Sequence, residues 1–271
     1  MFGGIFNRMY YGDPKKPDLN KEDIKQSRVK TFFTVVSVRF WQLIELNLMY
    51  AVFWLPAYLL LLASAIIFQE TGQSLDTAFY LFLIPCLVLT GPATAGVTYV
   101  LRNWARDEHA WVWSDFWDAW KANWKQGLLM MLINGVLIYI MNISLQFYRM
   151  NAGSSFFYLY LYYMVIVMGV LLFMMNMFIF PMMVTYRMSL MQIIRNAFLL
   201  TMIRLPFTFL IFLLAAALVF ASLYFLVSIP FFLVGLTFPY LIVISYVNMI
   251  LDKFVNSREE DEEESASEEE E

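Results

Sequence analysis

The sequence predicts an all-α membrane protein, a polytopic bundle of about six transmembrane helices with both chain ends in the cytoplasm. Three observations support this prediction. Hydrophobic residues make up 61% of the 271 residues, which exceeds what the core of a soluble domain requires. Five apolar tracts without a charged residue are each long enough to cross a bilayer. Lysine and arginine fall almost entirely in alternate connecting segments.

The charge distribution divides the chain into three regions. Residues 1–31 form a basic arm with an amphipathic segment, residues 32–255 form the membrane domain, and residues 256–271 form an acidic tail. The last fifteen residues hold ten carboxylates and one arginine, so the net charge of −4 conceals a charge of +5 elsewhere. A block of like charges with serine cannot pack, and we expect this tail to be disordered.

The lengths of the apolar tracts predict the individual spans. A transmembrane helix needs about 20 apolar residues, because each residue advances the helix by about 1.5 Å. The last tract, 205–251, is too long for one span, and Ser228-Ile229-Pro230 offers a break. The predicted spans are 44–69, 77–101, 126–148, 156–186, 205–228 and 230–251.

The positions of the cations predict the orientation in the membrane, since positively charged loops remain in the cytoplasm. With the N-terminus inside, the inner segments hold seventeen of the eighteen lysine and arginine residues, and only Arg149 lies outside. Each of the two inner connections follows a span that ends near a proline, Pro92 or Pro181. Each connection also contains an amphipathic stretch, which we expect to form an elbow helix before the next span.

Tryptophan marks the first of these elbows. Six of the eight tryptophans fall between residues 104 and 124. Four of them share one face of the predicted helix: Trp113, Trp117, Trp120 and Trp124. Tryptophan prefers the membrane interface, and it also dominates many protein interfaces. The four residues therefore anchor the segment in the headgroup region, dock a partner, or do both.

A few polar residues lie inside the predicted spans. Glu45 and Asn47 are the costliest to place in lipid, and such residues are functional candidates by default. Asn134 and Asn176 add amides to later spans. All of these can hydrogen-bond a neighbouring helix, and together they could line a polar path. Charged groups at mid-membrane are missing from the sequence, which argues against an ion-driven transporter.

The sequence offers no enzyme active site. It contains no HExxH, paired CxxC, GxSxG or Walker motif. The single histidine, His109, stands beside Asp107 and Glu108 in an inner segment, where adjacent side chains splay apart. We therefore expect no catalytic residue, no cofactor and no metal ion. The basic arm lacks a folded basic face, so no nucleic-acid partner is expected either.

The second span contains a motif for helix packing. Gly91 and Ala95 are four residues apart and form a small-xxx-small pair, which lets another helix approach closely. Pro92 lies between them and opens the backbone. The second span is therefore the expected packing centre of the bundle.

These elements resemble the YesL-like membrane proteins of Gram-positive bacteria. The resemblance runs roughly from residue 32 to residue 251, and after Tyr148 only hydropathy carries it. The matching residues are Asn47, Leu55-Pro56, Thr90-Gly91-Pro92-Ala93-Thr94-Ala95, Tyr99, Arg102-Asn103-Trp104, Arg106-Asp107-Glu108, Asp115-Phe116-Trp117 and Trp120-Lys121-Ala122-Asn123-Trp124-Lys125.

The resemblance implies a role beside sugar uptake, because these proteins are typically encoded next to carbohydrate ABC importers and glycan-degrading enzymes. The leading hypothesis is a non-catalytic accessory, regulatory or assembly subunit of an oligosaccharide ABC importer in the cell membrane. Its expected partners are the lipid bilayer and the importer's permease or ATPase subunits. The alternatives are a stand-alone permease or facilitator for a small solute, and a membrane scaffold unrelated to sugar.

Overall fold

The protein is described by a computed structural model that covers residues 28–72, 77–224 and 231–253. Every regular element in these ranges is helical, which confirms the all-α class for the described part of the chain. The elements are α2 (Arg28–Val38), α3 (Phe40–Thr71), η1 (Thr77–Phe82), α4 (Leu83–Ala105), α5 (Val112–Asn151), α6 (Phe156–Thr185), α7 (Leu190–Ile203), α8 (Leu205–Tyr224), η3 (Phe231–Gly235) and α9 (Thr237–Leu251). Most of the predicted basic arm, the acidic tail and the break at 228–230 lie outside the described residues.

Six helical segments in the described ranges are long and apolar enough to cross a membrane, which confirms the predicted number. They are Phe40–Thr71, Phe79–Ala105, Val112–Asn151, Phe156–Thr185, Leu205–Leu223 and Phe232–Leu251. By length and composition the chain is therefore a multi-pass helical membrane protein.

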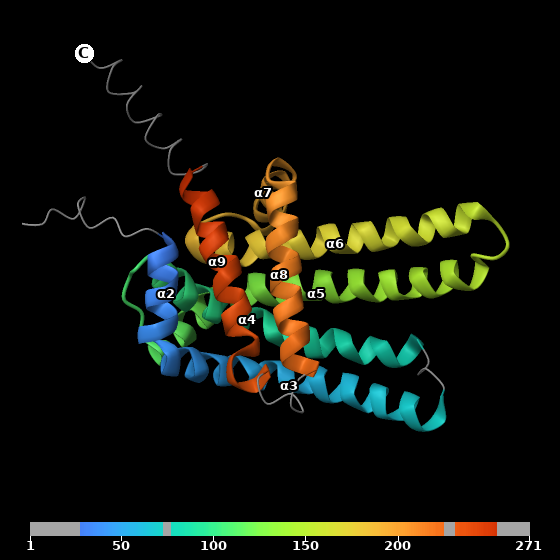
Figure 1. Ribbon diagram of the computed structural model, residues 1–271, viewed down its shortest axis with the longest axis horizontal. Coiled ribbons are helices and arrows are strands. Elements are labelled where there is room, and N and C mark those ends of the chain that lie inside the picture. Colours follow the sequence, from blue (N-terminus) through green and yellow to red (C-terminus); the bar gives the residue numbers. More distant parts are fainter. Residues whose placement is uncertain (1–27, 73–76, 225–230, 254–271) are drawn as a thin grey trace, which may run out of the picture.

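The six long helices form two groups that cross each other. Helices α3 to α6 lie side by side, whereas α8 and α9 run across them (Figure 1). Helix α9 contacts α3, α4 and α6, and α8 contacts α6 and α9. The α5–α6 turn lies at the far end of these helices from α2 and the α4–α5 connection (Figure 1). Helices α8 and α9 therefore cover one half of the α3–α6 layer and do not share its helix direction.

Capping residues explain where several helices begin and end. Gly72 adopts φ +68° and its N–H bonds the Phe68 carbonyl, an end that glycine accepts readily. At the start of α6 the Ser155 hydroxyl accepts from the Phe157 N–H. Ser189 and Gln192 form a capping box that starts α7. A separate short helix therefore stands where the sequence predicts the second elbow.

The first predicted elbow differs from the structure. The tryptophan segment forms the first turns of α5, which continues without a break for 40 residues. This helix contains no proline and its first glycine is Gly127, so nothing interrupts the backbone hydrogen bonds before the apolar part. Pro92 lies well inside α4, thirteen residues before its end, whereas Pro181 lies four residues before the end of α6, near the end as predicted. Helices α3 and α5 extend further than hydropathy indicates, and α6 does not.

Helices α4 and α5 pack backbone against backbone. A Cβ atom placed on Gly91 would lie 2.2 Å from the Gly127 carbonyl oxygen, and one on Gly127 would lie 3.0 Å from the Pro92 nitrogen. Ala95, one turn further along α4, is completely buried. The contact thus has no room for a side chain on either glycine, and it involves Gly91, one of the two small residues that the sequence indicates.

Helix α9 joins the two hydrophobic clusters of the described chain. One cluster surrounds Phe178 and Ile193 and includes Val247 of α9. The other surrounds Trp104 and includes Leu241 of the same helix. The crossing helix therefore takes part in both clusters.

Substituting Gly91→Ala is expected to lower the free energy of unfolding by about 1–3 kcal/mol, the usual cost of overpacking a tight contact. The measurement is the midpoint of heat-induced aggregation in mild detergent, read by size-exclusion chromatography. Gly153→Ala is the matched control, because nothing lies within 4 Å of a Cβ atom at Gly153. Equal midpoints for the wild type and Gly91→Ala would contradict the backbone contact.

Candidate functional site

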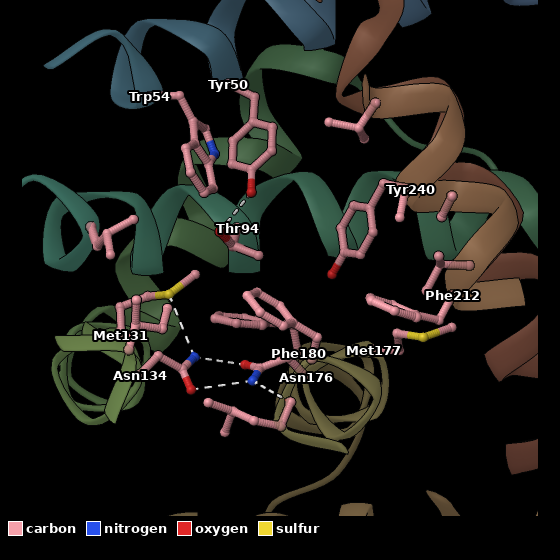
Figure 2. Close-up of a pocket in the computed structure, with 18 residues that line it drawn as sticks. Tyr50, Trp54, Thr94, Met131, Asn134, Asn176, Met177, Phe180, Phe212 and Tyr240 are labelled. Atoms are coloured by element: carbon pink, nitrogen blue, oxygen red, sulfur yellow. Dashed lines mark hydrogen bonds between the residues drawn. The ribbon is translucent and has the colours of Figure 1, made fainter. Parts of the chain in front are cut away.

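A cavity of about 300 Å³ lies where α8 and α9 cross the α3–α6 layer (Figure 2). Helices that cross steeply touch over a short length and diverge beside the contact, which leaves this space. Among the described residues that line it, none is charged. Its aromatic walls come from α3, α6, α8 and α9: Tyr50, Trp54, Phe173, Phe180, Phe212 and Tyr240.

The cavity lies deep within the helices. Tyr50 is ten residues from the start of α3, and Asn176 is nine residues from the end of α6. Both lie about 15 Å along their helices from the predicted inner ends, since the rise per residue is about 1.5 Å. Polar groups at this depth need partners within the protein.

A pair of amides forms one wall of the cavity. Asn134 Nδ2 donates to Asn176 Oδ1 at 2.7 Å, and Asn176 Nδ2 donates back to Asn134 Oδ1 at 3.2 Å. The second proton of Asn176 Nδ2 reaches the Leu172 carbonyl at 2.8 Å. The pair links α5 to α6, so the two asparagines that the sequence separates by 42 residues act together.

The opposite wall includes Thr94, the middle member of a row of three threonines on α4. Thr94 donates to the Thr90 carbonyl at 2.8 Å, and Thr98 donates to the Thr94 carbonyl at 2.5 Å. Two tyrosines reach this row from other helices. The Tyr50 hydroxyl lies 2.8 Å from Thr94 Oγ1, and the Tyr240 hydroxyl lies 2.6 Å from Thr98 Oγ1. Figure 2 shows Tyr50 and Tyr240 on the side of the cavity opposite the amide pair.

Sequence reasoning missed this row of hydroxyl groups. Thr90, Thr94 and Thr98 follow one another at a spacing of four residues, which places them on one face of a helix. That spacing is a detectable signal. The two tyrosines carry no comparable signal, because Tyr50 and Tyr240 lie 44 and 142 residues away from their threonine partners.

Asn47 binds the backbone at the start of α9. Its Nδ2 donates to the Phe232 carbonyl at 2.8 Å, and its Oδ1 accepts from the N–H groups of Leu236 at 3.0 Å and Thr237 at 2.9 Å. The side chain is completely buried. One amide therefore satisfies the backbone groups that are left open where the π-helical turn η3 changes into α9.

Glu45, the other polar residue of the first span, is half-buried. Arg39, which the sequence places one to two turns away, has its guanidinium 5.3 Å from the centre of the Trp104 ring. The arginine therefore packs on an aromatic face of α4. Glu45 contributes nothing to the cavity wall.

The four tryptophans of the first elbow have different environments. Trp113 and Trp124 are 58% and 44% exposed, whereas Trp117 and Trp120 are half-buried. The Trp117 ring lies 6.2 Å from the Phe53 ring of α3 and 5.9 Å from the Trp120 ring. Of these four, Trp113 and Trp124 therefore present the larger indole surfaces to lipid or a partner.

An ion pair joins the C-terminal ends of α4 and α9. Arg106 Nη2 lies 2.8 Å from Asp252 Oδ1, and both side chains are mostly buried. Just inside it, Asn248 Nδ2 donates to the Arg102 carbonyl at 3.3 Å. In the part of the chain that the structure describes, no three histidine, cysteine, aspartate or glutamate side chains converge as a metal site.

The fold and this apolar interior define a multi-pass helical membrane protein. Within it, residues 74–145 match the family described as "Protein of unknown function, DUF624", which includes the YesL-like proteins. The match covers 72 of the 271 residues and contains α4, the tryptophan segment and most of α5. No curated protein and no solved structure matched the chain.

Replacing Asn47 by leucine is expected to cost at least about 3 kcal/mol of unfolding free energy, since each unpaired buried polar group costs about 1–3 kcal/mol. Tryptophan fluorescence during heating in detergent measures the change. Asn142→Leu is the matched control, because the Asn142 side chain bonds only the exposed Gln146 in the described structure. A similar midpoint for Asn47→Leu and Asn142→Leu would contradict the role of Asn47.

The amide pair predicts a non-additive result. Asn176→Leu alone is expected to destabilise the protein by about 1–3 kcal/mol, because the Asn134 amide loses its partner. The double variant Asn134→Leu/Asn176→Leu is expected to be no less stable than the single one, since no amide is left unpaired. The measurement compares the thermal midpoints of the wild type, the two single variants and the double variant. Additive losses would show that the pair does not exist.

Proposed function

We propose that the protein is a non-catalytic accessory subunit that assembles, stabilises or regulates an oligosaccharide ABC importer. The observation that carries this proposal is the apolar surface that the described helices leave uncovered. Only 6% of the most apolar 18-residue stretch of α8 is buried, against 50% in the spans that contain α4 and α9. A helix with such a face packs against lipid or against another protein's helices.

The direction of α8 favours a protein partner for this face. Phe207, Leu210 and Phe220 of α8 are each at least 60% exposed. Because α8 runs across the α3–α6 layer, it cannot follow the bilayer normal when those four helices do (Figure 1). Neighbouring spans of a permease would cover a steeply inclined apolar helix better than lipid chains ordered along the normal.

The tryptophan segment offers a second contact surface. Trp113 and Trp124 are exposed on α5, and Lys125 Nζ lies 5.5 Å from the Trp124 ring. With both chain ends in the cytoplasm, as the distribution of lysine and arginine indicates, this surface faces the side on which an importer's ATPase subunits bind. Exposed tryptophan beside a cation is typical of binding hot spots.

The link to sugar uptake rests on the family resemblance. The YesL-like proteins are typically encoded beside carbohydrate ABC importers, and the DUF624 match covers the segment with the most specific residues of that resemblance. The cell membrane is the corresponding location. The alternative that does not depend on this resemblance is a membrane scaffold unrelated to sugar.

A stand-alone permease or facilitator is the second candidate, and the cavity is the observation that favours it. A hydrated sugar needs many hydrogen-bonding groups along its path. The walls of this cavity are mostly apolar, and the amides and hydroxyl groups that line it bond one another. These properties suit an interior whose polar groups are already hydrogen-bonded better than they suit a sugar pathway.

Affinity purification from native membranes in mild detergent is the decisive experiment. The proposal predicts that permease and ATPase subunits of a carbohydrate importer are recovered with the tagged protein in comparable amounts. Mass spectrometry identifies them. Recovery of the protein alone would contradict the proposal, and sugar flux into liposomes that contain only this protein would support the facilitator.

The double variant Trp113→Ala/Trp124→Ala is expected to reduce recovery of the partner by at least about tenfold, since two hot-spot side chains are lost. Trp41→Ala is the matched control, because Trp41 is 78% exposed on α3, outside the segment. Trp117 and Trp120 are unsuitable, since they pack against the bundle and their loss would disturb folding. Unchanged recovery with the double variant would exclude docking through this surface.

A further inference from the structure

The cavity between the crossed helices has the size and surface of a binding site for a chain molecule. Its volume of about 300 Å³ is enough for about ten carbon atoms, at roughly 30 Å³ for each group the size of a water molecule. Its lining is dominated by aromatic rings and aliphatic side chains, and no described lining residue carries a charge. Carboxylates and phosphates would find no charged partner there, and a free sugar carries more hydroxyl groups than these mostly apolar walls can bond.

The cavity opens toward lipid between α6 and α8. Phe173 of α6 and Ala216 of α8 both line it, and both are exposed on the surface of the protein. The Phe173 ring stacks on the Phe212 ring of α8 at 6.3 Å, and this pair bounds the opening. A ligand can therefore enter from the bilayer without crossing an aqueous phase.

The hydrogen bonds of the cavity leave a particular set of groups available. A hydroxyl has one proton, and the protons of Thr94 and Thr98 go to backbone carbonyls. The Tyr50 and Tyr240 hydroxyls therefore donate to these threonines, which leaves lone pairs on both tyrosine oxygens. The indole N–H of Trp54 is buried and is directed at the Tyr50 oxygen, so it is not available to a ligand.

The amide pair also leaves hydrogen-bond acceptors available and uses all of its donors. Both protons of Asn176 Nδ2 are engaged, by Asn134 Oδ1 and the Leu172 carbonyl. The protons of Asn134 Nδ2 go to Asn176 Oδ1 and the Met131 sulfur. Each amide oxygen accepts one bond from the other residue and keeps a lone pair. The polar groups of the cavity wall thus offer acceptors to a ligand.

We propose that this cavity binds one long apolar chain that ends in a hydroxyl group, that is, a long-chain alcohol or the hydroxyl end of a lipid of that kind. The chain fills the aromatic space, and its hydroxyl donates to a tyrosine or asparagine oxygen. A plain hydrocarbon would leave these groups unused, and an ether or ester could not donate. The proposal does not depend on the accessory function.

Photolabelling of the full-length protein in phosphatidylcholine vesicles tests this inference. The probe is 1-decanol that carries a diazirine in its chain, and the matched probes are its methyl ether and the corresponding decane. Labelling at the cavity residues by the alcohol is expected to exceed that by the ether or alkane at least about fivefold, the value of one hydrogen bond. Unlabelled 1-decanol should compete, and decane should not.

Two variants connect the label to the site. Ala215→Phe places a ring in the cavity and is expected to abolish the preference for the alcohol. Tyr50→Phe/Tyr240→Phe removes both tyrosine oxygens and should reduce the preference severalfold, whereas Tyr163→Phe, at an exposed site on α6, should leave it unchanged. The wild-type comparison of the three probes stands even when a variant fails to fold. Equal labelling by all three probes, or labelling outside the cavity, would mean that bulk lipid chains alone occupy the space and would overturn the proposal.

Discussion

The backbone contact between α4 and α5 is the constraint on which the other packing depends. Because Gly91 and Gly127 lack side chains, the two helices meet closely enough to act as one unit. Helix α4 then presents its threonines to Tyr50 of α3 and Tyr240 of α9, which bond to them. The positions of the outer helices thus follow from a contact that two glycines permit.

Polar groups in the interior of this apolar protein serve to join helices. Asn47 connects α3 to the start of α9, the amide pair connects α5 to α6, and the threonine row connects α4 to two tyrosines. A hydrogen bond inside a membrane helix bundle has no competition from water, so such links specify which helices meet. The cavity is lined by part of these links, namely the amide pair, Thr94 and the two tyrosines, whereas Asn47 lies outside it. The interior polarity that holds the bundle together also sets the chemistry available to a ligand.

The outer surface and the cavity suit different kinds of molecule. Exposed apolar residues of α8 and the exposed indoles of Trp113 and Trp124 suit contact with another membrane protein. The cavity is separate from both surfaces in its lining residues and suits a small apolar molecule. An accessory subunit can possess both, since partner contact and lipid binding use different faces of the helices.

Hydropathy alone determined the helical class and the number of long apolar helices, because a membrane span requires a minimum length of apolar sequence regardless of its neighbours. The small residues Gly91 and Ala95 also indicated where helices approach. The sequence did not reveal that α8 and α9 cross the other four, or that Trp117 and Trp120 turn inward. Those features depend on contacts between segments far apart in the chain, such as Asn47 with Thr237, 190 residues away. The tertiary structure decided them, since apolar patterns specify which residues avoid water but not which apolar helix each one meets.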